Sequence, residues 1–442
     1  MKKKENKLSA WQLTMMALGT VIGGSFFLGS AVAIRAAGPA IIIAYVLGGA
    51  LVYIILSALS EMTVADPAPG SFRTFATKAY GPAAGFIVGW VYWSGLVLAM
   101  SSEATAVSLF LQMWFPAISL PLLGSLVIIG VSLLNLLGAD RLSKLESGLA
   151  AVKLLAIVGF ILLSVALVGG FIPGKVSLGT SELMVESLFP AGIGGIAGSM
   201  LIVMFSYAGF EIIGLAASET STPHKTVPRA IMYTVLSLVG LYVLAIAALV
   251  LLIPTNILTT GESPLVAALV RWKLDWAGSV MSIVLITAIL STMLAAMFGL
   301  GRMIRSLANE GYAPGWLKDV GDIPRRGILF SGVAMLMGLG LGLILPQQVY
   351  LFLVSSGGFA LLFSYVVILA THYKLRKRTG CPPQGNCQLP GYPITSWLAL
   401  ISSVLIIASM PLIPGQGAGL LAGCILILFF FTIYFINKYY LT

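Results

Sequence analysis

The sequence predicts an all-α membrane protein with about twelve transmembrane helices, and three observations predict it. The chain has 442 residues, of which 59% are hydrophobic and 9% are charged. A soluble domain carries roughly 25% charged residues because its surface faces water, so most of this surface must face something else. The mean hydropathy is +1.02. The apolar residues also gather in runs of the length that spans a bilayer, which is about 20 residues.

Apolar runs and their polar or Pro/Gly boundaries divide the chain into twelve expected spans. These spans leave short loops and no room for a separate soluble domain, so residues 1–442 are expected to form a single transmembrane domain. The expected spans are 11–36, 40–60, 84–111, 120–138, 147–170, 191–217, 229–253, 278–301, 328–345, 349–371, 395–413 and 416–436.

The basic residues predict the orientation. Of the 25 Lys and Arg residues, all but Arg35, Lys175, Arg271 and Lys273 fall in one alternating set of segments. The positive-inside rule assigns the richer side to the cytoplasm. We therefore expect a multi-pass protein of the cell membrane with both termini in the cytoplasm. Two termini on one side require an even number of spans, which agrees with twelve.

The net charge of +10 raises the possibility of nucleic-acid binding. The basic residues lie at the ends of apolar runs and form no stripe interleaved with aromatic residues, so we expect no nucleic-acid partner. The N-terminal residues Met1-Lys2-Lys3-Lys4 resemble the start of a signal peptide. The apolar stretch that follows is longer than the 7–15 residues of a signal-peptide core, so we expect it to be retained as the first span.

Three cysteines, Cys381, Cys387 and Cys424, are too few for a disulfide framework. Cys381 and Cys387 share a loop assigned to the cytoplasm, where thiols stay reduced. Two thiols without a nearby third ligand make a poor zinc site. No HExxH, GxSxG or Walker A motif occurs. The sequence therefore predicts free thiols, no metal, no cofactor and no enzymatic activity.

Glycine clusters interrupt the first and sixth spans. Spacings such as Gly19/Gly23 allow close helix packing, which leaves a packing role open for any single glycine. The adjacent pair Gly23-Gly24 followed by Ser25 at mid-span instead favours a locally opened helix. Such backbone survives at membrane depth only where it is buried in protein or lines a cavity.

An opened helix has free N–H groups on one half and free C=O groups on the other. The N–H groups suit a carboxylate and the C=O groups suit an ammonium or another cation. An opened helix therefore suits both the carboxylate and the ammonium of a zwitterion. Spans one and six are five spans apart, which inverts the second copy. We expect repeats at 11–170 and 191–371, with residues 395–436 outside them.

Several motifs occur along the first ten spans. They are Gly19-Thr20-Val21-Ile22-Gly23-Gly24-Ser25-Phe26-Phe27-Leu28-Gly29, Gly89-Trp90-Val91-Tyr92-Trp93, Phe205-Ser206-Tyr207-Ala208-Gly209-Phe210-Glu211, Ala217-Ser218-Glu219-Thr220 with Pro223 and Pro228, Ser291-Thr292, Arg302, and Asn309-Glu310-Gly311-Tyr312-Ala313-Pro314. Together these motifs resemble the amino acid–polyamine–organocation superfamily, and its bacterial amino-acid permease branch most of all. The resemblance implies a LeuT-type fold, with a 5+5 inverted repeat plus two additional helices, and alternating access around spans one and six. The family usually has Gly-Ser/Thr-Gly at the first break, where this chain has Gly23-Gly24-Ser25.

The family pattern also implies where a substrate amino acid would bind. The amides of Gly24 and Ser25 would bind its carboxylate, and the carbonyl groups of Val21, Phe205 and Ala208 would receive its ammonium. Phe205 would occlude the substrate, unless it is an ordinary packing residue. The substrate-binding residues implied are Val21, Gly23, Gly24, Ser25, Phe205, Ala208 and Gly209.

Three ionisable residues fall at membrane depth, where even lenient scales give a cost of about 2.5–3.5 kcal/mol each. Counting residues from the expected span ends puts Lys153 and Glu211 at similar depth, with Glu103 nearer the outside. We therefore expect Lys153 to lie beside Glu211 rather than Glu103. The histidines, His224 and His372, fall in expected loops and are excluded from a proton relay.

Lys153 has two interpretations. It is a snorkelling residue at the interface, or, as the resemblance to sodium-independent members implies, a fixed replacement for the second sodium ion of sodium-coupled relatives. The second interpretation predicts a proton as the coupling ion, with Glu103 and Glu211 as candidate carriers. A structural role for Glu103 stays open.

Together these features predict proton-coupled symport of neutral or hydrophobic amino acids, because no charged side chain accompanies the break in span one. The alternatives are amino acid exchange and the transport of amines or polyamines by the same fold. A non-transporting amino acid sensor would need an added cytoplasmic domain, and a channel would need a filter motif. We find neither feature in the sequence.

Overall fold

The computed structural model describes residues 8–66, 70–172, 186–216, 220, 222–259, 262–319, 321, 323–344, 349–382 and 387–441. These residues are helical apart from turns, loops and an isolated β-bridge between Leu8 and Thr220. Residues 1–7, and residues 217–219 of the motif that follows span six, lie outside the described part.

The helices follow one another with short connections. They are α1 (Ala10–Val21), α2 (Gly24–Phe27), α3 (Ser30–Ala37), α4 (Ile41–Ala65), α5 (Phe72–Tyr80), α6 (Pro82–Gln112), α7 (Leu120–Asn135), α8 (Ala139–Val168), α9 (Gly192–Ser206), α10 (Ile212–Ala216), α11 (Pro223–Leu252), α12 (Pro264–Arg271), α13 (Asp275–Asn309), α14 (Arg325–Ile344), α15 (Val349–Thr379), α16 (Ile394–Ser409) and α17 (Gly417–Leu441).

The outer surface of the bundle is apolar. Large side chains such as Leu155, Leu162, Leu405, Leu421 and Phe429 are each more than half exposed. Among the described residues, eight helical segments are long and apolar enough to cross a membrane, and α7 and α9 are shorter apolar helices. The chain is therefore a multi-pass membrane protein. Each expected span contains helix, while the total of twelve spans stays a prediction.

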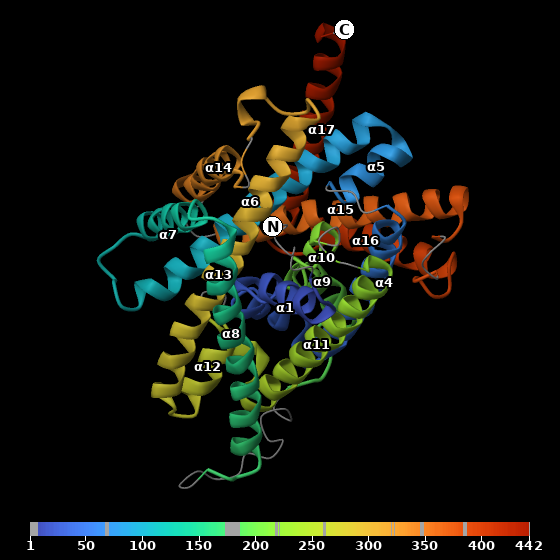
Figure 1. Cartoon of the computed structure of the whole chain (residues 1–442). Coiled ribbons are helices and arrows are strands. Elements are labelled where there is room, and N and C mark those ends of the chain that lie inside the picture. The colour runs from blue at the N-terminus through green and yellow to red at the C-terminus, as the bar shows by residue number, and fades with distance from the viewer. Residues whose placement is uncertain are drawn as a thin grey trace, which may run out of the picture.

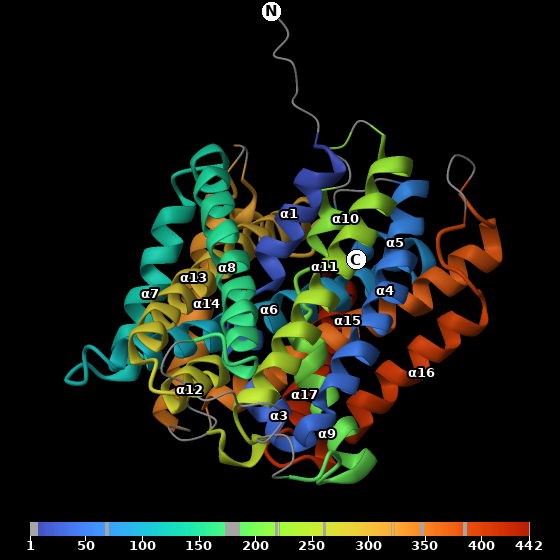
Figure 2. The ribbon, with the colours of Figure 1, turned by 90° about the horizontal axis from the view of Figure 1, so that it is seen from below.

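The interrupted helix α1 runs through the middle of the bundle. It packs against α8 and α13 on one side and against α10 and α11 on the other, as Figures 1 and 2 show. Helix α6 packs along α15, whereas α4 packs against α9 and α11. The two breaks therefore lie inside the protein and away from the lipid-facing surface.

Several helices extend beyond the apolar runs that predicted them. Helix α8 begins at Ala139 rather than at residue 147, and α15 continues to Thr379 rather than ending at 371. Hydropathy marks the apolar segment, whereas backbone hydrogen bonding continues through charged turns. For this reason the prediction that His224 and His372 lie in loops is wrong, since they belong to α11 and α15.

The prediction of free thiols at Cys381 and Cys387 is also wrong. A disulfide joins these residues, whose Cα atoms are 5.3 Å apart, while Cys424 is free and exposed. That Cα separation lies within the range of natural disulfides. Compartment and cysteine count governed the prediction, and neither measures how close the two residues lie in the folded chain.

Candidate functional site

The predicted break in the first span is present between α1 and α2. In a continuous helix the N–H groups of Gly24 and Ser25 would donate to the carbonyl groups of Thr20 and Val21. They donate instead to the carboxylate of Glu103, over 2.7 Å to Oε2 and 3.1 Å to Oε1. The carbonyl groups of Thr20 and Val21 are thus released from these helical partners.

Glu103 reaches the break from α6, and its side chain is buried. A Cβ atom at position 24 would lie 2.5 Å from Glu103 Oε2, so this close approach requires glycine. Hydrogen bonds to an ionised carboxylate are about twice as strong as neutral ones. Glu103 therefore occupies the two donors that the sequence pattern assigns to a substrate carboxylate.

Lys153 of α8 contacts the carbonyl side of the same break. Its Nζ atom donates to Gly19 O at 2.6 Å, to Ile22 O at 2.9 Å and to Thr292 Oγ1 at 3.2 Å. The Thr292 hydroxyl in turn donates to Ile22 O at 3.0 Å. Lys153 is fully buried, so it is not a snorkelling residue at the interface.

The expectation that depth separates Lys153 from Glu103 is wrong, because both side chains reach the first break. Helix α8 begins eight residues before the expected span, so Lys153 lies near its middle rather than six residues from an end. Glu211, which we expected beside Lys153, has its own partners at the second break.

The second break separates α9 from α10. Gly209 has a φ of +109°, which favours glycine. Its N–H group would bond to Phe205 O in a continuous helix, but it donates to Glu211 Oε2 at 2.9 Å. Tyr365 of α15 donates its hydroxyl to Glu211 Oε1 at 2.5 Å. The second break is therefore capped by a glutamate two residues along the same chain segment.

The two breaks contact each other directly. Thr20 Oγ1 donates to Gly209 O at 3.0 Å, and Ser206 Oγ donates to Ser25 O at 3.1 Å. Between them lies a cavity of about 60 Å³. Space of this size holds a few water molecules and is far below the roughly 300 Å³ of small ligand pockets. An amino acid would enter only after a side chain or helix moves.

Most of the predicted substrate-binding residues line this cavity. They are Val21, Ser25, Phe205, Ala208 and Gly209, and Glu103 is the charged residue among the described lining residues. The other predicted site residues lie at the breaks beside this cavity, and they are Gly23, Gly24, Lys153 and Glu211. The remaining wall is mainly apolar and includes Leu96, Met100, Ile212, Ala295, Ala296 and Leu361.

Comparison with known proteins decides the family. A family model described as amino acid permease matches residues 12–442. The chain belongs to this family. The permease is thus a membrane transporter and not an enzyme, and the predicted family is confirmed.

Relatives of this permease include transporters from several bacteria. The gamma-aminobutyric acid permease of Bacillus subtilis (strain 168) is 33% identical over 439 residues, which cover 96% of this chain and 92% of the relative. The gamma-aminobutyric acid permease of Escherichia coli (strain K12) is 33% identical, with 92% and 89% covered. The aromatic amino acid transport protein of Corynebacterium glutamicum is 30% identical, with 92% and 89% covered.

Proposed function

We propose that this permease takes up neutral amino acids together with protons, and that Glu103 exchanges places with the substrate carboxylate. One observation carries the proposal. Both carboxylate oxygens of Glu103 accept the N–H groups of Gly24 and Ser25. The carboxylate of an amino acid presents the same two acceptors, so it competes with Glu103 for the same pair of donors.

Protonation of Glu103 supplies the coupling. An ionised carboxylate is acceptor-only, whereas the protonated group has one O–H donor and less acceptor capacity. A proton on Glu103 therefore weakens its bonds to Gly24 and Ser25 and frees both amides for substrate. When the proton leaves on the other side of the membrane, Glu103 returns to the amides and displaces the substrate carboxylate.

The other parts of the cavity suit the rest of a neutral amino acid. The Val21 and Ala208 carbonyl groups lack their helical donors, because Ser25 N–H donates to Glu103 and Ile212 N–H donates to Gly209 O. These two groups receive the ammonium, whereas the predicted third carbonyl, Phe205 O, accepts the Ala208 N–H. The apolar wall suits a side chain without charge, and Phe205 closes the cavity over it. The named relatives carry gamma-aminobutyric acid and aromatic amino acids, which also combine one carboxylate with one ammonium.

Lys153 places its ammonium group against the carbonyl groups of Gly19 and Ile22 at the first break, where it takes the place of a sodium ion. We further propose a LeuT-type arrangement in the cell membrane, with inverted repeats at 11–170 and 191–371, residues 395–436 outside them, and both termini in the cytoplasm. Each proposed repeat begins with an interrupted helix, α1/α2 in the first and α9/α10 in the second.

An amine transporter is the second candidate. Glu103 carries its carboxylate into the cavity wall, where it would pair with the ammonium of a substrate that has no carboxylate. In that case Glu103 would stay on the amides of Gly24 and Ser25 throughout transport. The two candidates therefore differ in whether Glu103 must move.

Uptake into proteoliposomes tests the proposal. A panel of labelled amino acids, amines and polyamines is offered with imposed proton or sodium gradients. We expect accumulation of neutral amino acids driven by the proton gradient.

Glu103→Gln should lose accumulation and retain exchange between internal and external substrate, while the exposed control Glu262→Gln should behave as wild type. Sodium dependence without pH dependence would contradict proton coupling, and uptake of amines alone would favour the second candidate.

A further inference from the structure

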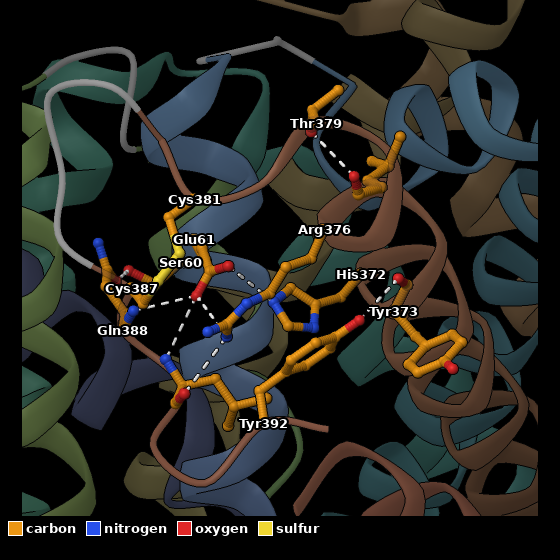
Figure 3. A network of polar contacts seen from close by, with 12 residues as sticks. Ser60, Glu61, His372, Tyr373, Arg376, Thr379, Cys381, Cys387, Gln388 and Tyr392 are labelled. Atoms are coloured by element: carbon orange, nitrogen blue, oxygen red, sulfur yellow. Dashed lines mark hydrogen bonds and ion pairs between the residues drawn. A yellow bond between two sulfur atoms is a disulfide. The ribbon is translucent and has the colours of Figure 1, made fainter. Parts of the chain in front are cut away.

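We propose that Cys381 and Cys387 form a reversible redox site, and that the disulfide slows transport by holding the chain after α15 against α4. The effect on transport rests on the proposed function, whereas the redox site itself does not. Glu61 is a buried carboxylate near the end of α4. Figure 3 shows the residues around it.

Glu61 holds the segment that follows the disulfide. Its Oε2 atom accepts the N–H groups of Gln388 at 3.0 Å and Leu389 at 3.3 Å. Arg376 of α15 donates to the same oxygen at 3.3 Å and to Leu389 O at 3.3 Å. Ser60 donates its hydroxyl to Gln388 Oε1. We call these residues, together with His372, the Glu61 network.

Two further contacts within this region involve side chains of α15. His372 Nε2 lies 3.2 Å from Glu61 Oε1, close enough for an ion pair but not aligned for a hydrogen bond. The Arg376 guanidinium lies 4.2 Å from the ring centre of Tyr392. A buried acceptor that loses its donors is destabilised by about its desolvation free energy. Glu61 therefore favours conformations that keep both amides in place.

The disulfide constrains the position of these amides. Cys387 directly precedes Gln388, and Cys381 lies two residues after the end of α15. Joining the two cysteines closes a short loop and removes conformations that the open chain would sample. The oxidised form thus presents Gln388 and Leu389 to Glu61, and the dithiol form holds them more weakly.

The sulfur atoms are accessible to small thiols. Both cysteines are exposed, and Cys381 borders a cavity of about 320 Å³ between α4, α5 and α15. A low-molecular-weight thiolate attacks one sulfur and releases the other as a thiolate. A second thiol then displaces the first cysteine from the mixed disulfide, which leaves two protein thiols and one low-molecular-weight disulfide. Oxidation by that small disulfide runs the same steps in reverse.

The network connects parts of the bundle that transport must move apart. Helix α4 packs against α9 and α11 near the second break, whereas α15 packs most extensively along α6, which carries Glu103, and also contacts α4 and α9. We infer that α4 moves with the broken helices and that α15 stays with α6, so that α4 must shift against α15 during transport. The oxidised site resists that shift because the segment after Cys387 is bonded to α4 and joined to α15.

The test uses the full-length permease in proteoliposomes, treated either with oxidised glutathione or with tris(2-carboxyethyl)phosphine. Alkylation and mass measurement should find one free thiol after oxidation and three after reduction. We expect reduction to raise the maximal uptake rate roughly three- to tenfold, the equivalent of one net hydrogen bond, with little change in KM. Hydrogen exchange at Gln388 and Leu389 should become faster on reduction, and this measurement needs no substrate.

Matched variants separate the outcomes. Cys381→Ser and Cys387→Ser should each transport at the faster rate of the reduced protein under both treatments. Cys424→Ser should keep the full response to oxidation and reduction. Glu61→Gln should transport at the faster rate even when oxidised. Equal rates in verified oxidised and reduced protein would overturn the regulatory role, and equal exchange at Gln388 and Leu389 would overturn the constraint. Faster exchange on reduction in a protein that transports no amino acid would refute the proposed function and leave the redox site intact.

Discussion

The two helix breaks obtain their partners in opposite ways. At the first break, Gly24 receives its acceptor from Glu103, 79 positions along the chain, and Gly19 and Ile22 receive their donor from Lys153, more than 130 positions away. At the second break, the Gly209 amide is capped by Glu211, two residues on. Tyr365 is the distant partner there, and it contacts the capping side chain rather than the backbone.

The backbone contacts of the first break therefore depend on other helices, whereas those of the second break depend on its own chain segment. A local cap travels with its own chain segment when helices move. Caps from α6 and α8 persist only while those helices keep their positions relative to α1 and α2. The first break is therefore the one at which a moving helix, a proton or a substrate can change the backbone contacts, and the following predictions test that distinction.

The largest effect is expected from removing the cation at the first break. Lys153→Met keeps an unbranched side chain that is one atom shorter, but it removes the buried donor of Gly19 O and leaves Ile22 O with the Thr292 hydroxyl as its donor. An unsatisfied buried group costs about 1–3 kcal/mol, and 1.4 kcal/mol is a factor of ten. We expect uptake to fall by more than about tenfold and the midpoint of thermal unfolding to decrease. Uptake assays and thermal denaturation measure both.

The control for that substitution is Lys225→Met, at an exposed position near the start of α11. It removes the same charge without touching either break, and we expect near wild-type uptake. Wild-type transport by Lys153→Met would show that the first break does not depend on its distant cation.

A smaller effect is expected at the second break. Tyr365→Phe removes the hydroxyl that donates to Glu211, and Glu211→Gln removes the charge of the cap while keeping an acceptor for the Gly209 amide. We expect the maximal rate to fall roughly three- to tenfold, in line with the loss of about one hydrogen bond. The dependence of uptake on the proton gradient should remain. Loss of that dependence in Glu211→Gln, with Glu103→Gln still coupled, would move the proton site to the second break.

The sequence predicted the breaks better than their partners. Glycine pairs and apolar runs are local signals, so the opening at Gly23-Gly24-Ser25 and the helices around it could be read directly. Depth estimates failed for Lys153 because residues 139–146, which include four charged side chains, are helical, so the helix begins before the apolar segment. Hydropathy measures only where lipid-compatible residues lie, not where backbone hydrogen bonding starts.

Long-range partners carried no local signal at all. Tyr365 is one of several hydroxyl side chains in an apolar span, and no spacing relates it to Glu211. The Glu61 network was missed for the same reason, because His372 and Arg376 were read as loop residues. Glu103 was identified as a candidate carrier, but the competition with a substrate carboxylate follows only from its contacts with the Gly24 and Ser25 amides.

The smallest effect, and the sharpest comparison, concerns the donors of the first break themselves. Ser25→Pro removes one of the two N–H groups that Glu103 accepts, at a first-turn position of α2 where proline is tolerated. We expect KM to rise roughly threefold, the equivalent of one modest hydrogen bond. Ser25→Gly keeps the amide, so its KM should stay within about twofold of wild type. The serine hydroxyl and the amide are thereby tested separately in one uptake assay. If Ser25→Gly impairs binding as much as Ser25→Pro, the side chain rather than the backbone contacts the substrate, and the first break would not select carboxylates through its amides.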